Sequence, residues 1–359
     1  YRIPLVFDRA ESINLKLDPS RVSYKFLHDR VQQAAYSLIP DSDKKATHLS
    51  IGKLLLENTP AEKLEENIFA LVNQLNVGID HLSLQSEKDE LAGLNLIAGR
   101  KAKAANAYEA AVKYLNTGMS LLVPDSWVRN YSMTLHLYVE TLEAEYLNTN
   151  FEQAEILAEV VLREAKNQLD LVKVYQLKIL FYQAQSQMLK AVETGLEVLE
   201  MLGINLLDHP NIPVPELPRI EELANLPVMT DPYQLAAMEI LTVLYPPAYI
   251  AKPEIVSSLI LTMVNLCIDH GHSALAAFPY TLYGTILCGV KGDIASGYHS
   301  GMIALKLLEQ FNAIQQKAKV YVMFNASIRI WKEPAKNTLA SFLEGMKSGV
   351  EIGDIEWAI

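Results

Sequence analysis

The sequence LAGLNLIAGRKAKAANAYEAAVKYLNTGMSLLVP, residues 91–124, decides the fold. It reads as two helices joined by a short turn, because its apolar residues recur at three- and four-residue intervals. Small residues lie where the two helices would cross closely: Ala98, Ala102, Ala105, Ala111 and Gly118. A helical hairpin cannot bury its hydrophobic face alone, so this one requires neighbours of the same kind.

Helical periodicity predicts such neighbours along most of the chain. Helices are expected at 27–38, 44–56 and 64–82, and pairs at 131–147 and 151–167, 171–188 and 191–202, 232–244 and 253–269, 274–290 and 294–311, and 314–331 and 336–350. Asp43 is placed to cap the helix that follows it, and Gly203 to end a helix in a left-handed conformation. Six prolines between residues 203 and 232 predict a long non-helical connection.

The second helices of these pairs share a repeated pattern. Ala111, Ala154 and Ala191 occupy one position of it, 43 and 37 residues apart, and Gly297 fits the same position. A small residue there lets two helices approach closely. The pattern resembles tetratricopeptide (TPR) repeats, although those have a shorter period of about 34 residues. The predicted fold class is all-α, a TPR-like right-handed α-solenoid of helical hairpins.

The N-terminal segment has a different periodicity. Residues 13–17 and 22–26 alternate apolar and polar residues around a turn at Pro19, which predicts a short β-hairpin. The string YKFLHDRVQQAAY, residues 24–36, resembles the end of the winged-helix segment of STAND-type signalling ATPases. Together with HLSIGKLLLEN, NIFALVNQLNVG and LNLIAGRKAKAANAYEAAVKYL, it looks like the linker region of bacterial multi-sensor signalling kinases. The resemblance covers most of residues 20–205 and, more loosely, the remainder.

This resemblance implies four parts. Residues 1–42 would end a winged helix, 43–205 and 232–359 would be TPR-like repeats, and 206–231 would be a Pro-rich connection. The implied role is that of a non-catalytic scaffold between an upstream STAND/AAA ATPase and downstream sensor and histidine or Ser/Thr kinase domains. Since the chain starts at Tyr1 without a methionine and ends in the first turn of a helix, we expect it to be a piece of a longer protein.

Composition excludes several other classes. The net charge of −11 disfavours a phosphate-binding or anionic membrane surface, so neither nucleic acid nor membrane insertion is expected. No apolar run reaches the roughly 18 residues of a membrane span. The two cysteines, Cys267 and Cys288, form no disulfide framework, which predicts a reducing cytoplasm.

The sequence offers little chemistry. It has no phosphate-binding loop and no kinase catalytic motif. His28 and Asp29 could suggest a metal-dependent phosphohydrolase, but a packed histidine and a helix-start aspartate explain them better. Cys267, His270 and His272 have metal-ligand side chains, yet a helix C-cap is the better interpretation. We therefore predict no catalytic, cofactor-binding or metal-binding residue and no cofactor.

The remaining conspicuous residues are interpreted as structural. Cys288 and His299 are expected to be buried or half-buried. Arg100, Lys101 and Lys103 are expected on a solvated face. Tyrosines at helical spacing could line a peptide groove but are expected mainly between helices: Tyr108, Tyr114, Tyr131, Tyr138, Tyr146, Tyr175, Tyr182, Tyr280, Tyr283 and Tyr298. A stand-alone peptide-binding TPR adaptor and an α-helical enzyme are the alternative functions, and the protein partner and oligomeric state stay open.

Overall fold

The computed structural model describes residues 29–206, 217–219, 222 and 226–358. Within these ranges the chain is all-α, with no strand and one isolated β-bridge, between Val228 and His272. The predicted all-α class is confirmed. The predicted β-hairpin lies in residues 1–28, outside the described residues.

The helices occur in a regular succession along the chain. The long helices of the first half are α2 (Asp41–Glu57), α3 (Leu64–Val77), α4 (Gln85–Ala104), α5 (Tyr108–Ser120), α7 (Tyr131–Leu147), α8 (Phe151–Glu164), α9 (Gln168–Ala184) and α10 (Met188–Met201). Those of the second half are α11 (Pro232–Ala251), α12 (Val256–His270), α13 (Ala277–Ile286), α14 (Ile294–Gln310), α15 (Ile314–Ser327) and α16 (Leu339–Ile352). Shorter helices are α1 (Asp29–Ser37), α6 (Ser126–Arg129) and α17 (Ile355–Ala358).

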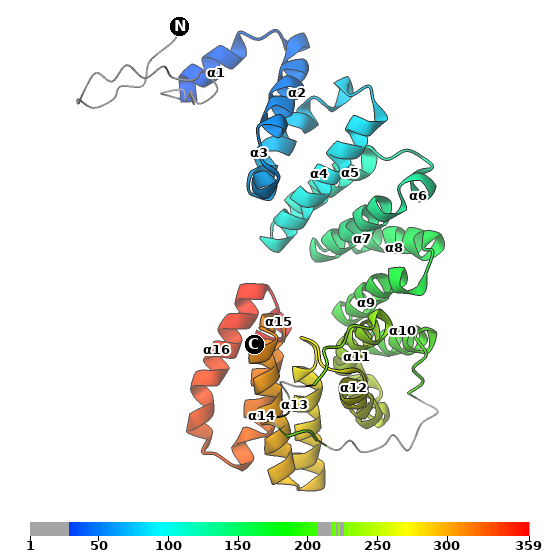
Figure 1. The fold of residues 1–359 in the computed structure, drawn as a ribbon, viewed down its shortest axis with the longest axis vertical. Coiled ribbons are helices and arrows are strands. Elements are labelled where there is room, and N and C mark those ends of the chain that lie inside the picture. Colours follow the sequence, from blue (N-terminus) through cyan, green and yellow to red (C-terminus); the bar gives the residue numbers. More distant parts are fainter. Residues whose placement is uncertain (1–28, 207–216, 220–221, 223–225, 359) are drawn as a thin grey trace, which may run out of the picture.

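Consecutive helices pack as pairs, such as α4 with α5, α9 with α10, and α13 with α14. The second helix of a pair also packs against the first helix of the next pair, as α5 does with α7 and α10 with α11. First helices of neighbouring pairs contact each other as well, as α4 does with α7 and α9 with α11. Figure 1 shows the pairs following one another along a curved path that opens toward the left of the view.

A recurrent turn joins the helices within three of the pairs. Asn106, Thr149 and Ser186 have φ angles of 58°, 63° and 60°, the left-handed conformation. In each turn the next N–H donates to a carbonyl five residues back, for example Ala107 N to Ala102 O at 2.9 Å. This is the Schellman arrangement, which satisfies carbonyls at a helix end. Helix ends with this geometry aim the second helix back along the first.

The small residue of the repeated pattern stands five positions after each left-handed residue. Ala111, Ala154 and Ala191 are at most 3% exposed. Gly297 follows the left-handed Gly292 by the same interval, and a Cβ at Gly297 would lie only 2.3 Å from Cys288 Sγ. Close approach of two helices therefore explains the small residues, as the sequence predicts.

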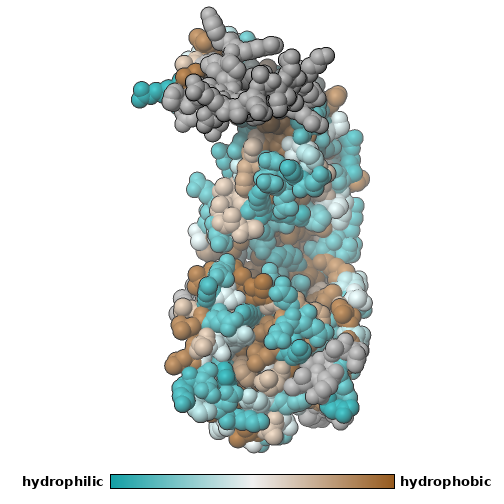
Figure 2. All heavy atoms as spheres, turned by 60° about the vertical axis from the view of Figure 1, so that its left-hand side comes forward, coloured by the Kyte–Doolittle hydropathy of each residue, from teal (hydrophilic) through white to brown (hydrophobic). Residues whose placement is uncertain are grey.

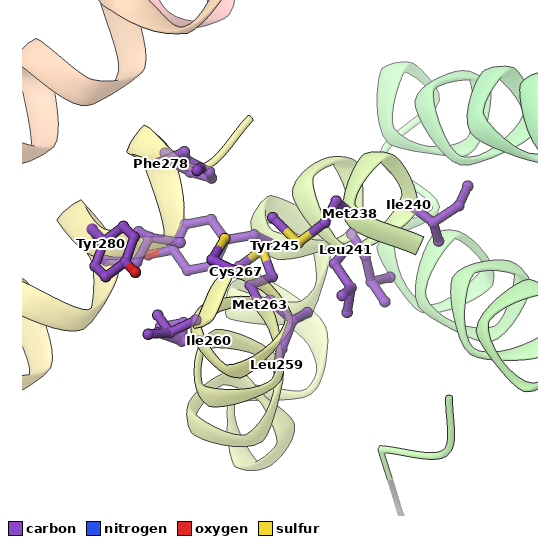
Figure 3. Close-up of a cluster of buried hydrophobic side chains, with 14 of the residues drawn as sticks. Met238, Ile240, Leu241, Tyr245, Leu259, Ile260, Met263, Cys267, Phe278 and Tyr280 are labelled. Carbon is purple, nitrogen blue, oxygen red and sulfur yellow. The ribbon is translucent and has the colours of Figure 1, made fainter. Parts of the chain in front are cut away.

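The largest hydrophobic core lies in the C-terminal half, where α11, α12 and α13 converge (Figure 3). Leu241, Met263 and Phe278, one from each helix, are at most 1% exposed. Each such side chain contributes roughly 1.5–3 kcal/mol when fully buried. A second core extends from α2 to α7, and a smaller cluster of α7, α8 and α9 lies between the two.

The Pro-rich connection ends against the turn between α12 and α13. Met229 N donates to His272 O and His272 N to Pro227 O, at 2.9 and 2.8 Å. Gly271 has a φ of 97°, and a Cβ there would lie 2.3 Å from Pro227 O. Only glycine satisfies both the backbone angle and the close approach.

Some predicted helix ends are wrong. α2 begins at Asp41 after Pro40, so Asp43 lies in the first turn and is not the cap. α3 ends at Val77 with Gly78 as its C-cap, five residues before the predicted end. α11 continues seven residues past Leu244, through Pro246 and Pro247. Packing on α9, α10 and α12 outweighs the two hydrogen bonds that these prolines remove.

Candidate functional site

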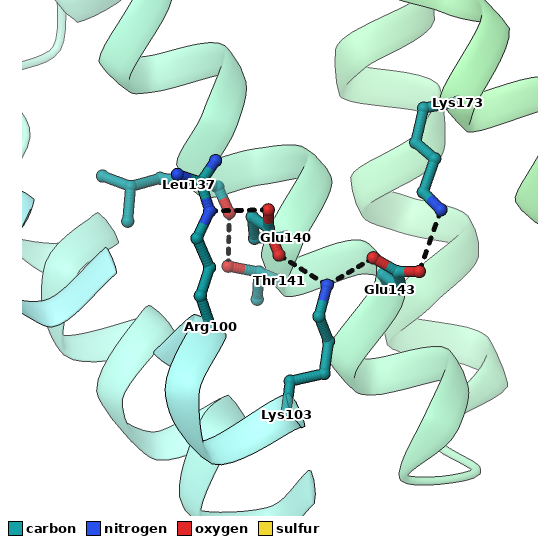
Figure 4. Close-up of polar contacts among 7 residues, drawn as sticks. All are labelled: Arg100, Lys103, Leu137, Glu140, Thr141, Glu143 and Lys173. Atoms are coloured by element: carbon teal, nitrogen blue, oxygen red, sulfur yellow. Dashed lines mark hydrogen bonds and ion pairs between the residues drawn. The ribbon is translucent and has the colours of Figure 1, made fainter. Parts of the chain in front are cut away.

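Five charged residues connect three successive first helices (Figure 4). This charge network consists of Arg100 and Lys103 on α4, Glu140 and Glu143 on α7, and Lys173 on α9. Positive and negative side chains alternate along the network, so each carboxylate lies between two cations. Arg100 is exposed, as the predicted solvated face requires, whereas Lys103 is largely buried against α7.

The distances show a tight arrangement. Arg100 Nε lies 2.7 Å from Glu140 Oε1, and Lys103 Nζ lies 2.5 Å from Glu140 Oε2. Lys103 also pairs with Glu143, which in turn lies 2.9 Å from Lys173 Nζ. The side chain of Lys103 is only 18% exposed, so solvent screens these pairs less than ordinary surface pairs.

The network shifts the pKa values of its members. Burial acts to lower the pKa of Lys103, but Glu143 and Glu140 outweigh it, so the pKa rises above its usual value. Burial acts to raise the pKa of Glu143, but Lys173 and Lys103 hold it below its usual value. Both residues therefore stay charged over a wider pH range than free side chains.

The next first helix, α11, presents a different surface on this side. The residues on one side of this helix follow helical spacing and form what we call the α11 stripe: Pro232, Leu235, Glu239, Val243, Pro246 and Ile250. Pro232, Glu239 and Ile250 are exposed, whereas the other three are half-buried. Five of the six are apolar, and Ile250 is 63% exposed. Glu239 is the exception. Surrounding side chains displace water and raise its pKa, while Lys173 acts in the opposite direction and thus ties the stripe to the charge network.

The predicted cysteine and histidine cluster is a structural feature. His270 ends α12 and Gly271 forms its C-cap, as expected. His272, however, is only 2% exposed, and its Nε2 lies 2.9 Å from the Tyr280 hydroxyl. Burial lowers the pKa of His272 to about 4 and raises that of Cys267 to about 12. In the part of the chain that the structure describes, no three His, Cys, Asp or Glu side chains form a group suited to a metal ion.

The other singled-out residues lie as follows. His28 is outside the described residues, and Asp29 is the first residue of α1, consistent with its predicted place at a helix start. Cys288 is 3% exposed, and the half-buried His299 donates from Nε2 to Pro218 O at 2.9 Å. Lys101 donates to the carbonyls of Glu65 and Glu66.

The predicted packing role of the tyrosines is confirmed. Tyr280 and Tyr283 are buried. The rest are half-buried: Tyr108, Tyr114, Tyr131, Tyr138, Tyr146, Tyr175, Tyr182 and Tyr298. Tyr114, for example, stacks on Phe69 with ring centroids 5.6 Å apart. The α11 stripe and the charge network were not predicted from the sequence, because both depend on which helices become neighbours.

The comparison with known proteins gives one signalling relative. The hybrid signal transduction histidine kinase G of Dictyostelium discoideum is 23% identical over 389 residues, which cover 93% of this chain. The chain spans about 11% of the length of that kinase. No protein-family model matches the chain. The chain is thus distantly similar to one region of a signal transduction histidine kinase.

Among the described residues, none forms a helix that is both long and apolar enough to cross a bilayer.

Proposed function

We propose that this chain is a non-catalytic helical-repeat scaffold within a multidomain signal transduction kinase. In this proposal it is a TPR-like right-handed α-solenoid that carries contacts between an upstream STAND ATPase and downstream sensor and output domains. The observation that carries the proposal is the alignment of 93% of the chain with a small region of a hybrid histidine kinase. The succession of helix pairs along the chain suits a scaffold, since each pair offers surface to other domains.

A relay through such an array acts through the contacts between neighbouring pairs. Gly195 on α10 is a suitable place to disturb one contact, because a Cβ there would lie 2.5 Å from Leu244 Cδ1 on α11. Gly93 on α4 is a matched control, since a Cβ at that position meets no atom within 4 Å. Gly195→Leu places a large side chain in the contact between two helix pairs, whereas Gly93→Leu makes the same chemical change where there is open space.

The test measures autophosphorylation of the native protein that contains this chain. We expect Gly195→Leu to change the rate at least about threefold, corresponding to under 1 kcal/mol of coupling, and Gly93→Leu to leave it unchanged. The isolated chain should give no phosphotransfer or hydrolysis above blank in an activity panel. Equal rates for the wild type and both variants would contradict the relay, and activity of the isolated chain would contradict the non-catalytic role.

The second candidate function is a stand-alone peptide-binding adaptor. The exposed Ile250 at the C-terminal end of the α11 stripe favours it, because an exposed apolar side chain beside partly exposed ones suits contact with a protein ligand. The length of the native protein separates the two candidates: an adaptor consists of little more than these repeats, whereas a kinase scaffold is flanked by ATPase and output domains.

A further inference from the structure

The surface of α16 differs from that of other second helices. α16 is the second helix of the pair that it forms with α15. Four large apolar side chains on it are between 46% and 65% exposed and recur at intervals of four, three and four residues; we call them the α16 stripe: Leu339, Leu343, Met346 and Val350. By contrast, α5 and α14, whose residues are all described, expose no large apolar side chain, and α8 and α10 expose one each.

The neighbouring helices α15 and α17 cover another face of α16. That face carries the buried Gly345 and Gly349. A Cβ at Gly345 would lie 3.1 Å from Tyr321 Cβ on α15, and one at Gly349 would lie 2.8 Å from Ala358 Cβ on α17. At 100° per residue, the α16 stripe lies about 110° around the helix from these two glycines. The packing of α15 and α17 therefore leaves the stripe exposed.

The α16 stripe lies on a side of the molecule that is open to another molecule. In Figure 2 the left-hand side of Figure 1, where α16 lies, comes forward, and brown hydrophobic surface is visible over this half of the molecule. A continuous row of exposed apolar side chains along one helix is unfavourable in water and is typical of a surface that binds another protein. The spacing of the row identifies a helix as its counterpart, because helices pack through rows of residues three and four apart.

The α16 stripe is complementary to itself. Its intervals of four, three and four read the same from both ends of the helix. Two copies of α16 that run antiparallel about a two-fold axis therefore place Leu339 opposite Val350 and Leu343 opposite Met346. Each apolar side chain of one copy then meets an apolar side chain of the other, as a two-fold interface requires.

Charged residues beside the α16 stripe favour the antiparallel direction. The exposed Lys336 precedes the stripe, and the exposed Glu351 follows it. Glu351 lies 3.9 Å from Lys347 of the same helix, and its side chain remains 64% exposed. In an antiparallel pair, Lys336 of each copy comes beside Glu351 of the other, whereas a parallel pair places like charges side by side.

We propose that α16 binds the α16 of a second copy of this chain, as an antiparallel helix pair formed by the stripes of both copies. At 1.5 Å per residue the stripe is about 17 Å long, so the interface is small and belongs to the weak, reversible class. The proposal goes beyond the proposed function and does not rest on it, because it depends only on the surface of α16.

The first experiment is sedimentation equilibrium of the 359-residue chain at concentrations from about 2 to 200 μM. We expect the average mass to rise with concentration from that of the monomer, 40.1 kDa, toward twice that value. Leu343→Glu places a charge in the middle of the stripe and should weaken dimerisation at least about tenfold. Leu189→Glu is the matched control, since Leu189 is also exposed but lies on α10.

Three outcomes of this experiment overturn the proposal. They are a monomer at every concentration, a dimer that Leu343→Glu leaves intact, and a dimer that Leu189→Glu weakens equally. Circular dichroism of each variant checks the fold.

The second experiment uses single added cysteines to find the direction of the pair, which is possible because Cys267 and Cys288 are both buried. A disulfide forms only where two Cα atoms lie within about 7 Å. Under mild oxidation, a mixture of Leu339→Cys and Val350→Cys should therefore give a linked heterodimer, whereas Leu339→Cys alone should give none. Linkage of Leu339→Cys to itself, without the heterodimer, overturns the antiparallel arrangement.

The third experiment reverses the flanking charges. Lys336→Glu and Glu351→Lys should each weaken dimerisation about threefold at low salt, the size of an exposed ion pair. The two changes combined in one chain should restore it, because the pairs form again with opposite signs. Additive weakening in the double variant overturns the contact between Lys336 and Glu351.

Discussion

His272 makes the C-terminal half sensitive to acid. The imidazole is 2% exposed, and its Nδ1 is buried without a hydrogen-bond partner. Its other nitrogen contacts the hydroxyl of Tyr280, and burial keeps both Tyr280 and the nearby Cys267 neutral by raising their pKa values. No carboxylate is among the causes of its pKa shift. Protonation therefore places an unpaired charge in the core.

The sign and size of the effect follow from the two pKa values. The pKa of a histidine in an unfolded chain is about 6.5, and burial lowers that of His272 to about 4. Between these values the unfolded chain binds the proton and the folded chain does not. Stability is thus fully present above pH 6.5 and falls as the pH is lowered toward 4. The difference corresponds to about 3 kcal/mol.

Hydrogen exchange measured by mass spectrometry can follow this loss locally, which matters because repeat arrays can unfold in parts. Opening free energies of amides in α12 and α13 should fall between pH 6.5 and 4.5 in the wild type. His272→Phe should flatten this dependence, because it removes the titrating group while keeping a ring in place. His270→Phe, at an exposed position two residues away, should preserve it. Parallel pH profiles for wild type and His272→Phe would refute the reasoning.

Three further predictions concern other parts of the array. Thr149 has an exposed, β-branched side chain at a φ of 63°, so Thr149→Gly should raise the unfolding free energy by about 1 kcal/mol; the converse change, Gly203→Ala, should lower it by about 1 kcal/mol in the same denaturation assay. In the charge network, Lys103→Met and Glu143→Gln should each cost about 2 kcal/mol, and a double-mutant cycle should give a coupling of about 1 kcal/mol, whereas additive costs would argue against the pair. Hydrogen bonds from Arg329, Tyr298 and Asn337 lower the pKa of Glu333 to about 2, so its stabilising contribution should be complete above about pH 4.3 and disappear as the pH falls through 2, with the midpoint visible in carboxyl NMR.

Much of the fold follows from local sequence patterns. The repeated small residues at Ala111, Ala154 and Ala191 mark the close crossings, because their spacing is set by the turns before them. The left-handed residues of those turns are Asn106, Thr149 and Ser186. None of them is a glycine, the residue that usually marks a left-handed turn in a sequence. Here the hydrogen bonds of the helix end impose the conformation, so residue type alone does not reveal it.

The remaining misjudgements have tertiary causes. Pro246 and Pro247 would end an isolated helix, but α11 is surrounded on three sides by α9, α10 and α12. Lys103 lies in a run of basic residues that looks solvated, yet the acidic face that pairs with it is 37 and 40 residues away in sequence. A single sequence does not reveal which helices become neighbours, so the candidate site was not predictable from it.

The charge network crosses the chain where its apolar interior is thinnest. The N-terminal core ends at α7, and the C-terminal core begins at α9. Between them lies a cluster of only seven buried residues. Hydrophobic contact resists separation of helices but tolerates sliding, whereas ion pairs at fixed distances resist sliding as well. Between α7 and α9 the bending stiffness of the array therefore depends on electrostatics. Because Arg100 and Lys173 are 44% and 41% exposed, rising ionic strength weakens the outer pairs of the network and makes this region easier to bend, whereas the Lys103 pairs are screened less.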